Sequence, residues 1–130
     1  MRILLELTLG LHMAGAAFWL LTSLVLGFGQ PAEASVRLFR PQMVAATVAV
    51  FSGGGLWSLL HPGGFGRQEM VLAAGAVLAI AAAGVQGAMV GGPVRRLPDP
   101  AAASKVVRGQ KIAAVLLALA LACMLIVRHV

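Results

Sequence analysis

Four apolar stretches divide the chain, and each is long enough to cross a lipid bilayer. They cover approximately residues 3–28, 41–60, 70–90 and 111–127. About 20 apolar residues in a helix span the roughly 30 Å of hydrocarbon in a membrane. Runs such as LAAGAVLAIAAAG consist of helix-favouring residues and lack the alternation of a barrel strand. The pattern therefore predicts an all-α, polytopic membrane protein, with one domain made of a four-transmembrane-helix bundle.

Glycine and proline separate these stretches, as the letters GQP, HPGG and GGP after the first three show. Asp99 followed by Pro100 is typical of a helix start, so we expect the last helix to begin before its membrane part. Ser35–Arg40 is compatible with a short interfacial turn. The first stretch is too long for a cleaved signal sequence and contains Glu6 and His12, which predicts a retained helix. We expect Glu6 to be solvated or paired with Arg2, and the alternative is that it starts a proton or cation path.

Composition and charge support this interpretation and suggest an orientation. Of the 130 residues, 60% are hydrophobic and only 11% are charged, which is too apolar for a small soluble domain. Three of the ten basic residues fall at the termini and in the second loop, and seven fall in the first and third loops: Arg37, Arg40, Arg95, Arg96, Lys105, Arg108 and Lys111. The positive-inside rule then predicts loops 1 and 3 in the cytoplasm and both termini outside an inner cell membrane. The net charge of +6 is consequently no sign of nucleic-acid binding.

Small and polar residues recur at helical spacing and indicate which faces pack together. In the first helix the stripe contains Thr8, His12, Gly15, Trp19 and Ser23. In the second it contains Thr47, Phe51, Gly54, Ser58 and His61. The third helix offers Gly75, Ala79, Ala83, Gly84, Gln86 and a GxxxG pattern at Gly87–Gly91. We expect the stripes of the first two helices to face the bundle interior, and the small residues of the third helix to mark helix interfaces.

His12 is the strongest candidate for a functional side chain. It lies roughly 13 Å below the outer interface at 1.5 Å per residue, and an ionisable group at that depth marks a functional site by default. The alternative is a structural hydrogen bond to a hydroxyl or a carbonyl on a facing helix. His61, at the end of the second stretch, is the candidate second ligand. Trp19 shares the face of His12 and either lines a porphyrin pocket or fills the bundle.

Softer ligands lie in the same outer half of the membrane. Imidazole together with thioether and thiolate groups suits Cu(I), whereas paired imidazoles suit haem iron. The weaker copper candidates are Met13, Cys123, Met124 and His129, and each of them has a packing or interfacial role as its alternative. The single cysteine excludes an intrachain disulfide and any CxxC pair.

The segment LHMAGAAFW at residues 11–19 places a tryptophan seven residues after a histidine. The second helix follows Arg37 and Arg40-Pro41 and carries SGGGL at residues 52–56. Over roughly its first sixty residues, the chain thus resembles small membrane proteins related to the copper-resistance D family and to the HemJ type of protoporphyrinogen oxidase. The HemJ resemblance implies a helical bundle with His12 as an axial ligand of haem b. The copper-resistance resemblance implies copper uptake at the inner membrane.

The sequence therefore favours a membrane protein that binds haem b through His12, with His61 as the second ligand, for electron transfer or a small redox reaction. Two alternatives remain: a cofactor-free accessory subunit of a respiratory membrane complex, and a copper-handling protein. The expected depths of the two histidines differ by about 13 Å. The second helix would have to tilt or its loop dip inward, or His12 would bind alone, or a homodimer would supply His12 twice. The expected partners are the lipid bilayer and either a second copy or a larger respiratory complex.

Overall fold

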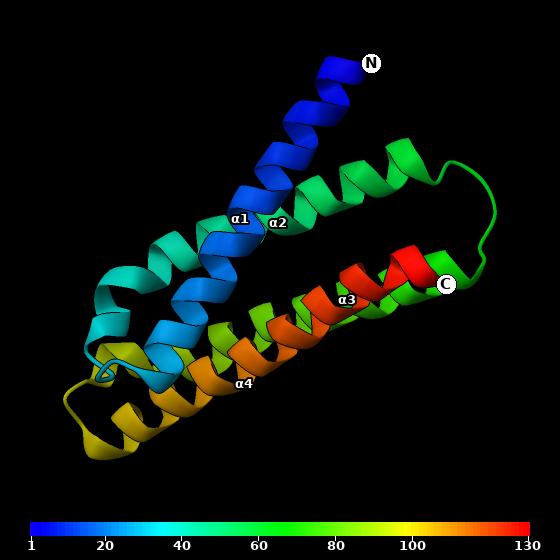
Figure 1. Ribbon diagram of the computed structural model, residues 1–130. Helices are drawn as coiled ribbons and strands as arrows, with labels where there is room; N and C mark the ends of the chain where they lie inside the picture. Colours follow the sequence, from blue (N-terminus) through cyan, green and yellow to red (C-terminus); the bar gives the residue numbers. More distant parts are fainter.

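The computed structural model describes residues 1–130 and consists of four long helices. They are α1 (Arg2–Phe28), α2 (Ala34–Leu60), α3 (Arg67–Gln86) and α4 (Pro100–Ile126), and consecutive helices run antiparallel (Figure 1). Both termini and the 61–66 loop lie at one end, the termini end; the 29–33 and 92–99 loops lie at the other, the basic end. Each helix is long and apolar enough to cross a membrane. The predicted fold class is confirmed, and the chain is an integral membrane protein.

Shorter helical turns extend two of the long helices. α3 continues as a π-helical turn, η1 (Gly87–Gly91), which is followed by a 3-10 turn, η2 (Pro93–Arg96). α4 ends in a second 3-10 turn, η3 (Val127–His129). At its start, Asp99 is the N-cap residue and Pro100 occupies the first turn, as the sequence predicts. α4 therefore begins well before its most apolar part.

α2 begins earlier than the apolar pattern predicts. It starts at Ala34, and residues 35–40 belong to its first turns rather than to a separate interfacial turn. Pro41 lies inside the helix, where it removes one backbone N–H and the bond to the carbonyl four residues earlier. That carbonyl belongs to Arg37, which is exposed near the basic end. Water or headgroups can satisfy it there, so the helix tolerates the proline.

The four helices pack as two close pairs, α1 with α2 and α3 with α4. α1 also contacts α4 extensively, whereas α2 and α3 scarcely touch. The α1–α2 pair diverges from the α3–α4 pair towards the termini end (Figure 1). The tightest four-helix packing is consequently in the half of the molecule nearer the basic end.

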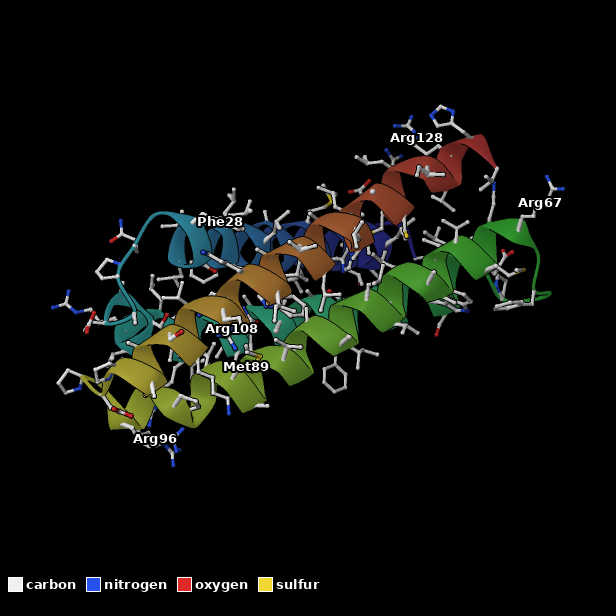
Figure 2. The ribbon with its side chains drawn as sticks, turned by 90° about the horizontal axis from the view of Figure 1, so that it is seen from below. Phe28, Arg67, Met89, Arg96, Arg108 and Arg128 are labelled. Carbon is white, nitrogen blue, oxygen red and sulfur yellow. The ribbon has the colours of Figure 1, made fainter.

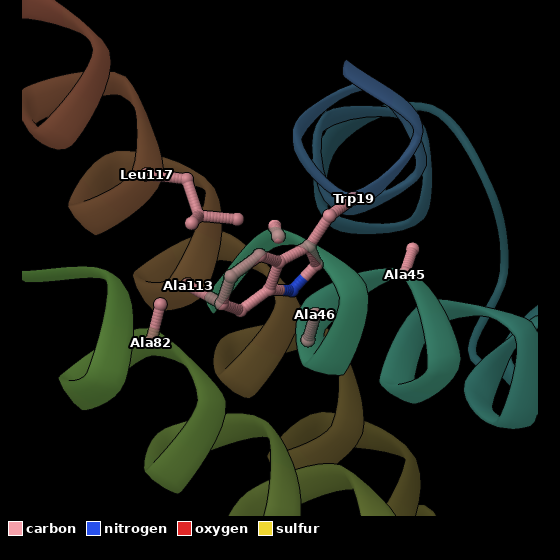
Figure 3. Packing of buried hydrophobic residues seen from close by; sticks show 7 residues of the cluster. Trp19, Ala45, Ala46, Ala82, Ala113 and Leu117 are labelled. Carbon is pink, nitrogen blue, oxygen red and sulfur yellow. The ribbon is translucent and has the colours of Figure 1, made fainter. Parts of the chain in front are cut away.

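The core is built around Trp19, which is only 1% exposed. Its indole lies among small side chains contributed by the other three helices, together with one leucine: Ala45, Ala46, Ala49, Ala82, Ala113 and Leu117 (Figure 3). Gly15, one turn before Trp19, lets the backbones of α1 and α2 approach closely, since a Cβ on Gly15 would lie 3.1 Å from the Ala45 carbonyl oxygen. Small residues at an interface allow the close backbone approach on which helix association in lipid depends.

The inward stripe predicted for α1 is confirmed. Gly15, Trp19 and Ser23 are buried, and Thr8 and His12 are half-buried. The Arg2–Glu6 pair is also present, with 2.9 Å between Nε and Oε1.

The stripe predicted for α2 is wrong in its central positions: Thr47, Phe51, Gly54 and Ser58 are all exposed. The face that packs inward instead contains Ser35, Gln42, Ala45, Ala46, Ala49 and Leu56. The hydroxyls of Thr47 and Ser58 donate to carbonyls four residues earlier in the same helix, at 2.9 and 3.2 Å. A hydroxyl satisfied in this way tolerates lipid, so it does not mark an inward face.

The small residues of α3 are divided between two faces. Gly75 is buried at an interface as predicted and Gln86 is buried too, whereas Gly84 and Gly87 are exposed and a Cβ on either would meet nothing within 4 Å. Of the GxxxG pair, only Gly91 makes a close contact, against the ring of Phe39.

Candidate functional site

His12 lies where α1 crosses α2, and its ring is anchored to the α2 backbone. Nδ1 is 2.9 Å from the carbonyl oxygen of Ala49. Because a carbonyl oxygen only accepts, Nδ1 carries the proton and donates this bond. The ring packs against Gly53, where a Cβ would lie 3.1 Å from Cε1. The missing side chain at Gly53 therefore provides the space that the imidazole occupies.

The other ring nitrogen of His12 has no partner within the chain. Every buried polar side-chain atom in the structure has a hydrogen-bond partner, so the unpaired Nε2 of this half-buried residue must reach the protein surface. α1 has 27 residues, which corresponds to about 40 Å, and His12 lies within about 5 Å of its midpoint. The chain thus presents the unpaired Nε2 of His12 to its surroundings at hydrocarbon depth.

Ser52 is the second polar group near the ring. Its Oγ is 3.3 Å from Nδ1 of His12, and its hydroxyl bonds to the carbonyl of Val48 in the same helix. The Ser52 hydroxyl therefore donates its hydrogen within α2. Ser52 supports the orientation of the imidazole but does not bond to Nε2 of His12.

His61 follows the last residue of α2 and belongs to a separate polar cluster at the termini end. Its Nδ1 is 2.7 Å from Oε1 of Glu69, and Oε2 of the same carboxylate accepts the Gly66 N–H at 2.8 Å. The His61 ring also lies 5.8 Å from that of Trp57. This arrangement closes the 61–66 loop over the first turn of α3. Along α2, His61 lies about 12–18 Å beyond Gly53 and Ala49, which hold His12, so the structure does not bring the two rings together.

Trp19, the third candidate in the haem interpretation, is committed to the core. Its Nε1 donates to Oε1 of Gln86 at 2.6 Å, and alanines surround its ring (Figure 3). The indole fills the bundle, which is the second of the two roles that the sequence left open.

The residues that bond with Trp19 belong to a buried polar network that sequence analysis largely missed. Three fully buried glutamines, one each from α2, α3 and α4, meet near two serines: Gln42, Gln86, Gln110, Ser23 and Ser35. Gln86 Nε2 donates to Ser23 Oγ at 2.8 Å and to Gln110 Oε1 at 3.0 Å. Gln110 and Gln42 donate to each other, at 3.0 and 3.2 Å. The network satisfies itself and contains no titratable group.

The copper candidates do not meet His12. Met13 is 62% exposed on α1, and His129 is exposed at the end of the chain. Cys123 packs between α3 and α4. A Cβ added to Gly75 of α3 would lie 3.3 Å from the Cβ of Cys123. Met124, its neighbour, is half-buried. No three His, Cys, Asp or Glu side chains are grouped in a way that could hold a metal ion.

Comparison with known proteins adds no family. No family model, no curated protein and no solved structure matches this chain. The resemblance carried by residues 11–19 and 52–56 therefore stays a prediction.

Proposed function

We propose that this membrane protein binds b-type haem through Nε2 of His12 and serves electron transfer or a small redox reaction. The observation that carries the proposal is the state of the His12 ring: Nδ1 is anchored on the Ala49 carbonyl, while Nε2 is unpaired at hydrocarbon depth. A metal-bound histidine typically donates its other N–H to a carbonyl or a carboxylate, which fixes its tautomer and orientation. An unpaired polar atom in lipid costs free energy, so a partner outside the chain is expected.

The donor set would supply one imidazole ligand from each chain. His61 is too far along α2 to bind the same iron, and no thiolate or thioether lies at the His12 ring. A two-fold homodimer would supply a second His12 at the same depth, and without one His12 would be the only ligand that the protein provides. Bound haem would supply one-electron chemistry. The residues of the chain orient the His12 ring and keep the site dry. The Ala49 carbonyl holds the ring, Gly53 leaves room for it, and the apolar helices exclude water.

Visible spectroscopy of the protein purified from haem-replete cells tests this proposal. We expect a Soret band in the wild type that is retained in His61→Ala and His129→Ala and lost in His12→Ala. The two retained variants are matched controls, since each removes an imidazole elsewhere in the chain. Metal analysis of the same sample separates iron from copper. A colourless wild-type preparation would refute haem binding.

The same nitrogen supports a second candidate, an accessory subunit of a larger respiratory membrane complex. In that role Nε2 accepts a hydrogen bond from a donor on the partner subunit. Nε2 reaches the protein surface, so a donor on the partner subunit can approach it there. The expected result is a colourless wild type that purifies with larger partners, and a loss of those partners in His12→Leu. If both the colour and the partners are absent, neither role holds.

A further inference from the structure

Two shallow surface depressions follow one another along α4 and share Lys111. The first, of about 230 Å³, is lined by one valine and three residues that carry a hydroxyl or a positive charge: Ser104, Val107, Arg108 and Lys111. The second, of about 250 Å³, is apolar apart from that lysine and is lined by Lys111, Ile112, Val115 and Leu116. Positions three and four residues apart lie on one side of a helix, so the two depressions form one continuous strip. We call this strip the α4 groove. It begins with two cations and a hydroxyl and continues as an aliphatic surface.

The cations of the α4 groove have no anionic partner in the chain. Seven basic side chains gather at the basic end, against the two carboxylates of Glu33 and Asp99. Both ion pairs in the structure lie at the termini end, so none of the seven is neutralised. Figure 2 shows Arg96 and Arg108 towards the basic end, with Arg67 and Arg128 at the other. The basic end therefore attracts anions.

Contacts with the end of α1 hold Lys111 at the junction of the groove. Its Nζ lies 5.6 Å from the centre of the Phe28 ring. A Cβ on Gly27 would come within 3.0 Å of the Lys111 backbone nitrogen, so α1 forms a close wall beside the lysine. The ammonium group is thereby kept beside the groove.

The depth of the groove matches the layers of a bilayer. α4 has 27 residues and is about 40 Å long, which exceeds the roughly 30 Å of hydrocarbon by about two turns. Those polar turns precede Lys111, since the apolar stretch starts there. Ser104 and Arg108 consequently lie at headgroup level, and Ile112 and Val115 lie at acyl-chain level.

We propose that the α4 groove is a binding site for an anionic phospholipid. Arg108 and Lys111 bind the lipid phosphate, the first as a planar fork and the second as a point charge, and the Ser104 hydroxyl donates to a phosphate oxygen. One acyl chain lies along Ile112, Val115 and Leu116. Basic pockets on the cytoplasmic side of membrane proteins bind lipid headgroups in this manner. A free phosphate ion would use the polar part alone and leave the aliphatic part without a role.

Native mass spectrometry of the full chain, purified in detergent and titrated with dioleoyl phosphatidylglycerol, tests the proposal. We expect tighter binding than for dioleoyl phosphatidylcholine, which has the same chains. Each cation near the surface contributes to the attraction of an anionic lipid, so we expect Arg108→Gln/Lys111→Gln to bind phosphatidylglycerol about tenfold or more weakly than the wild type. The matched control, Arg95→Gln/Arg96→Gln, removes the same charge from the same end and should bind as the wild type does. If both double variants bound the lipid equally more weakly than the wild type, the binding would reflect general charge attraction, and the proposed site would be refuted.

Two further arms separate a lipid from a free anion. Val115→Trp fills the aliphatic part of the groove at an exposed position without changing any charge, and we expect it to weaken lipid binding. Inorganic phosphate, added in excess, should leave the lipid bound. Displacement of the lipid by phosphate, or unchanged binding in Val115→Trp, would each overturn the proposal. Arg108→Gln alone repeats the charge test if the double variant does not fold.

Discussion

Replacing Gln110 with leucine should destabilise the bundle more than any single polar change on its surface. Gln110 makes four side-chain hydrogen bonds, to Gln42, Gln86 and Ser35. Leucine keeps most of the volume but makes none of them. The Ser35 hydroxyl and Oε1 of Gln42 then lose their only side-chain partners, and both residues are buried.

The expected loss of stability follows from these bonds. Interhelical hydrogen bonds in membrane proteins contribute about 0.6 kcal/mol each on average, so four bonds give about 2–3 kcal/mol. Orphaned buried acceptors cost about 1–3 kcal/mol each when nothing replaces the donor, which sets the upper end. Replacing all three glutamines by leucine removes the orphaned amides as well. The triple variant should therefore lose less than the sum of the single changes.

Reversible unfolding in mixed micelles, followed by Trp19 fluorescence in a Trp57→Phe background, measures this difference. Thr47→Val is the matched control, because its hydroxyl bonds only within α2 on an exposed face, and its effect should stay within about 0.5 kcal/mol. A Gln110→Leu variant as stable as this control would refute the view that the network holds the four helices together.

Three other changes test local features of the structure. Gly109→Ala places a Cβ 2.7 Å from a side-chain carbon of the π-helical turn and should cost about 1–3 kcal/mol in the same unfolding assay, whereas Gly84→Ala meets nothing and should be neutral or stabilising. Glu69→Gln weakens the acceptor for His61 and the cap of α3, so limited proteolysis should cut the 61–66 loop faster than in the wild type. Ser104→Cys, in a background without the native cysteine, should react with a membrane-impermeant maleimide only after the cytoplasmic face is opened, and labelling in intact cells would reverse the orientation.

Length and hydropathy were sufficient to predict four antiparallel helices, because a membrane admits few other ways to satisfy the backbone. They did not predict the inward face of α2. There the polar pattern selected Thr47 and Ser58, whose hydroxyls bond within their own helix, while half of the buried residues at the true interface are alanines. Alanine is equally apolar towards lipid and towards protein, so hydropathy alone cannot assign its side.

The candidate site was predictable to a similar extent. The depth of His12 could be predicted from its position in an apolar stretch, and a hydrogen bond to a carbonyl on the facing helix was one of the expected alternatives. Which carbonyl it is, and that Nε2 stays unpaired, depends on the crossing of α1 and α2. Gln42 and Gln110 escaped notice because they fall at the edges of the apolar stretches, where a polar residue is ordinary. Only the early starts of α2 and α4 carry them into the bundle.

The polar network is divided between two helical hairpins, and this has a consequence for biogenesis. The α1–α2 hairpin emerges from the ribosome first, with Gln42 able to reach only Ser23 and with the Trp19 N–H still lacking its acceptor. Its remaining amide groups are satisfied once Gln86 and Gln110 enter the membrane with the second hairpin. A nascent chain halted between the hairpins would therefore expose unpaired amides to lipid, a mark by which membrane quality control can distinguish an unfinished protein from a finished one.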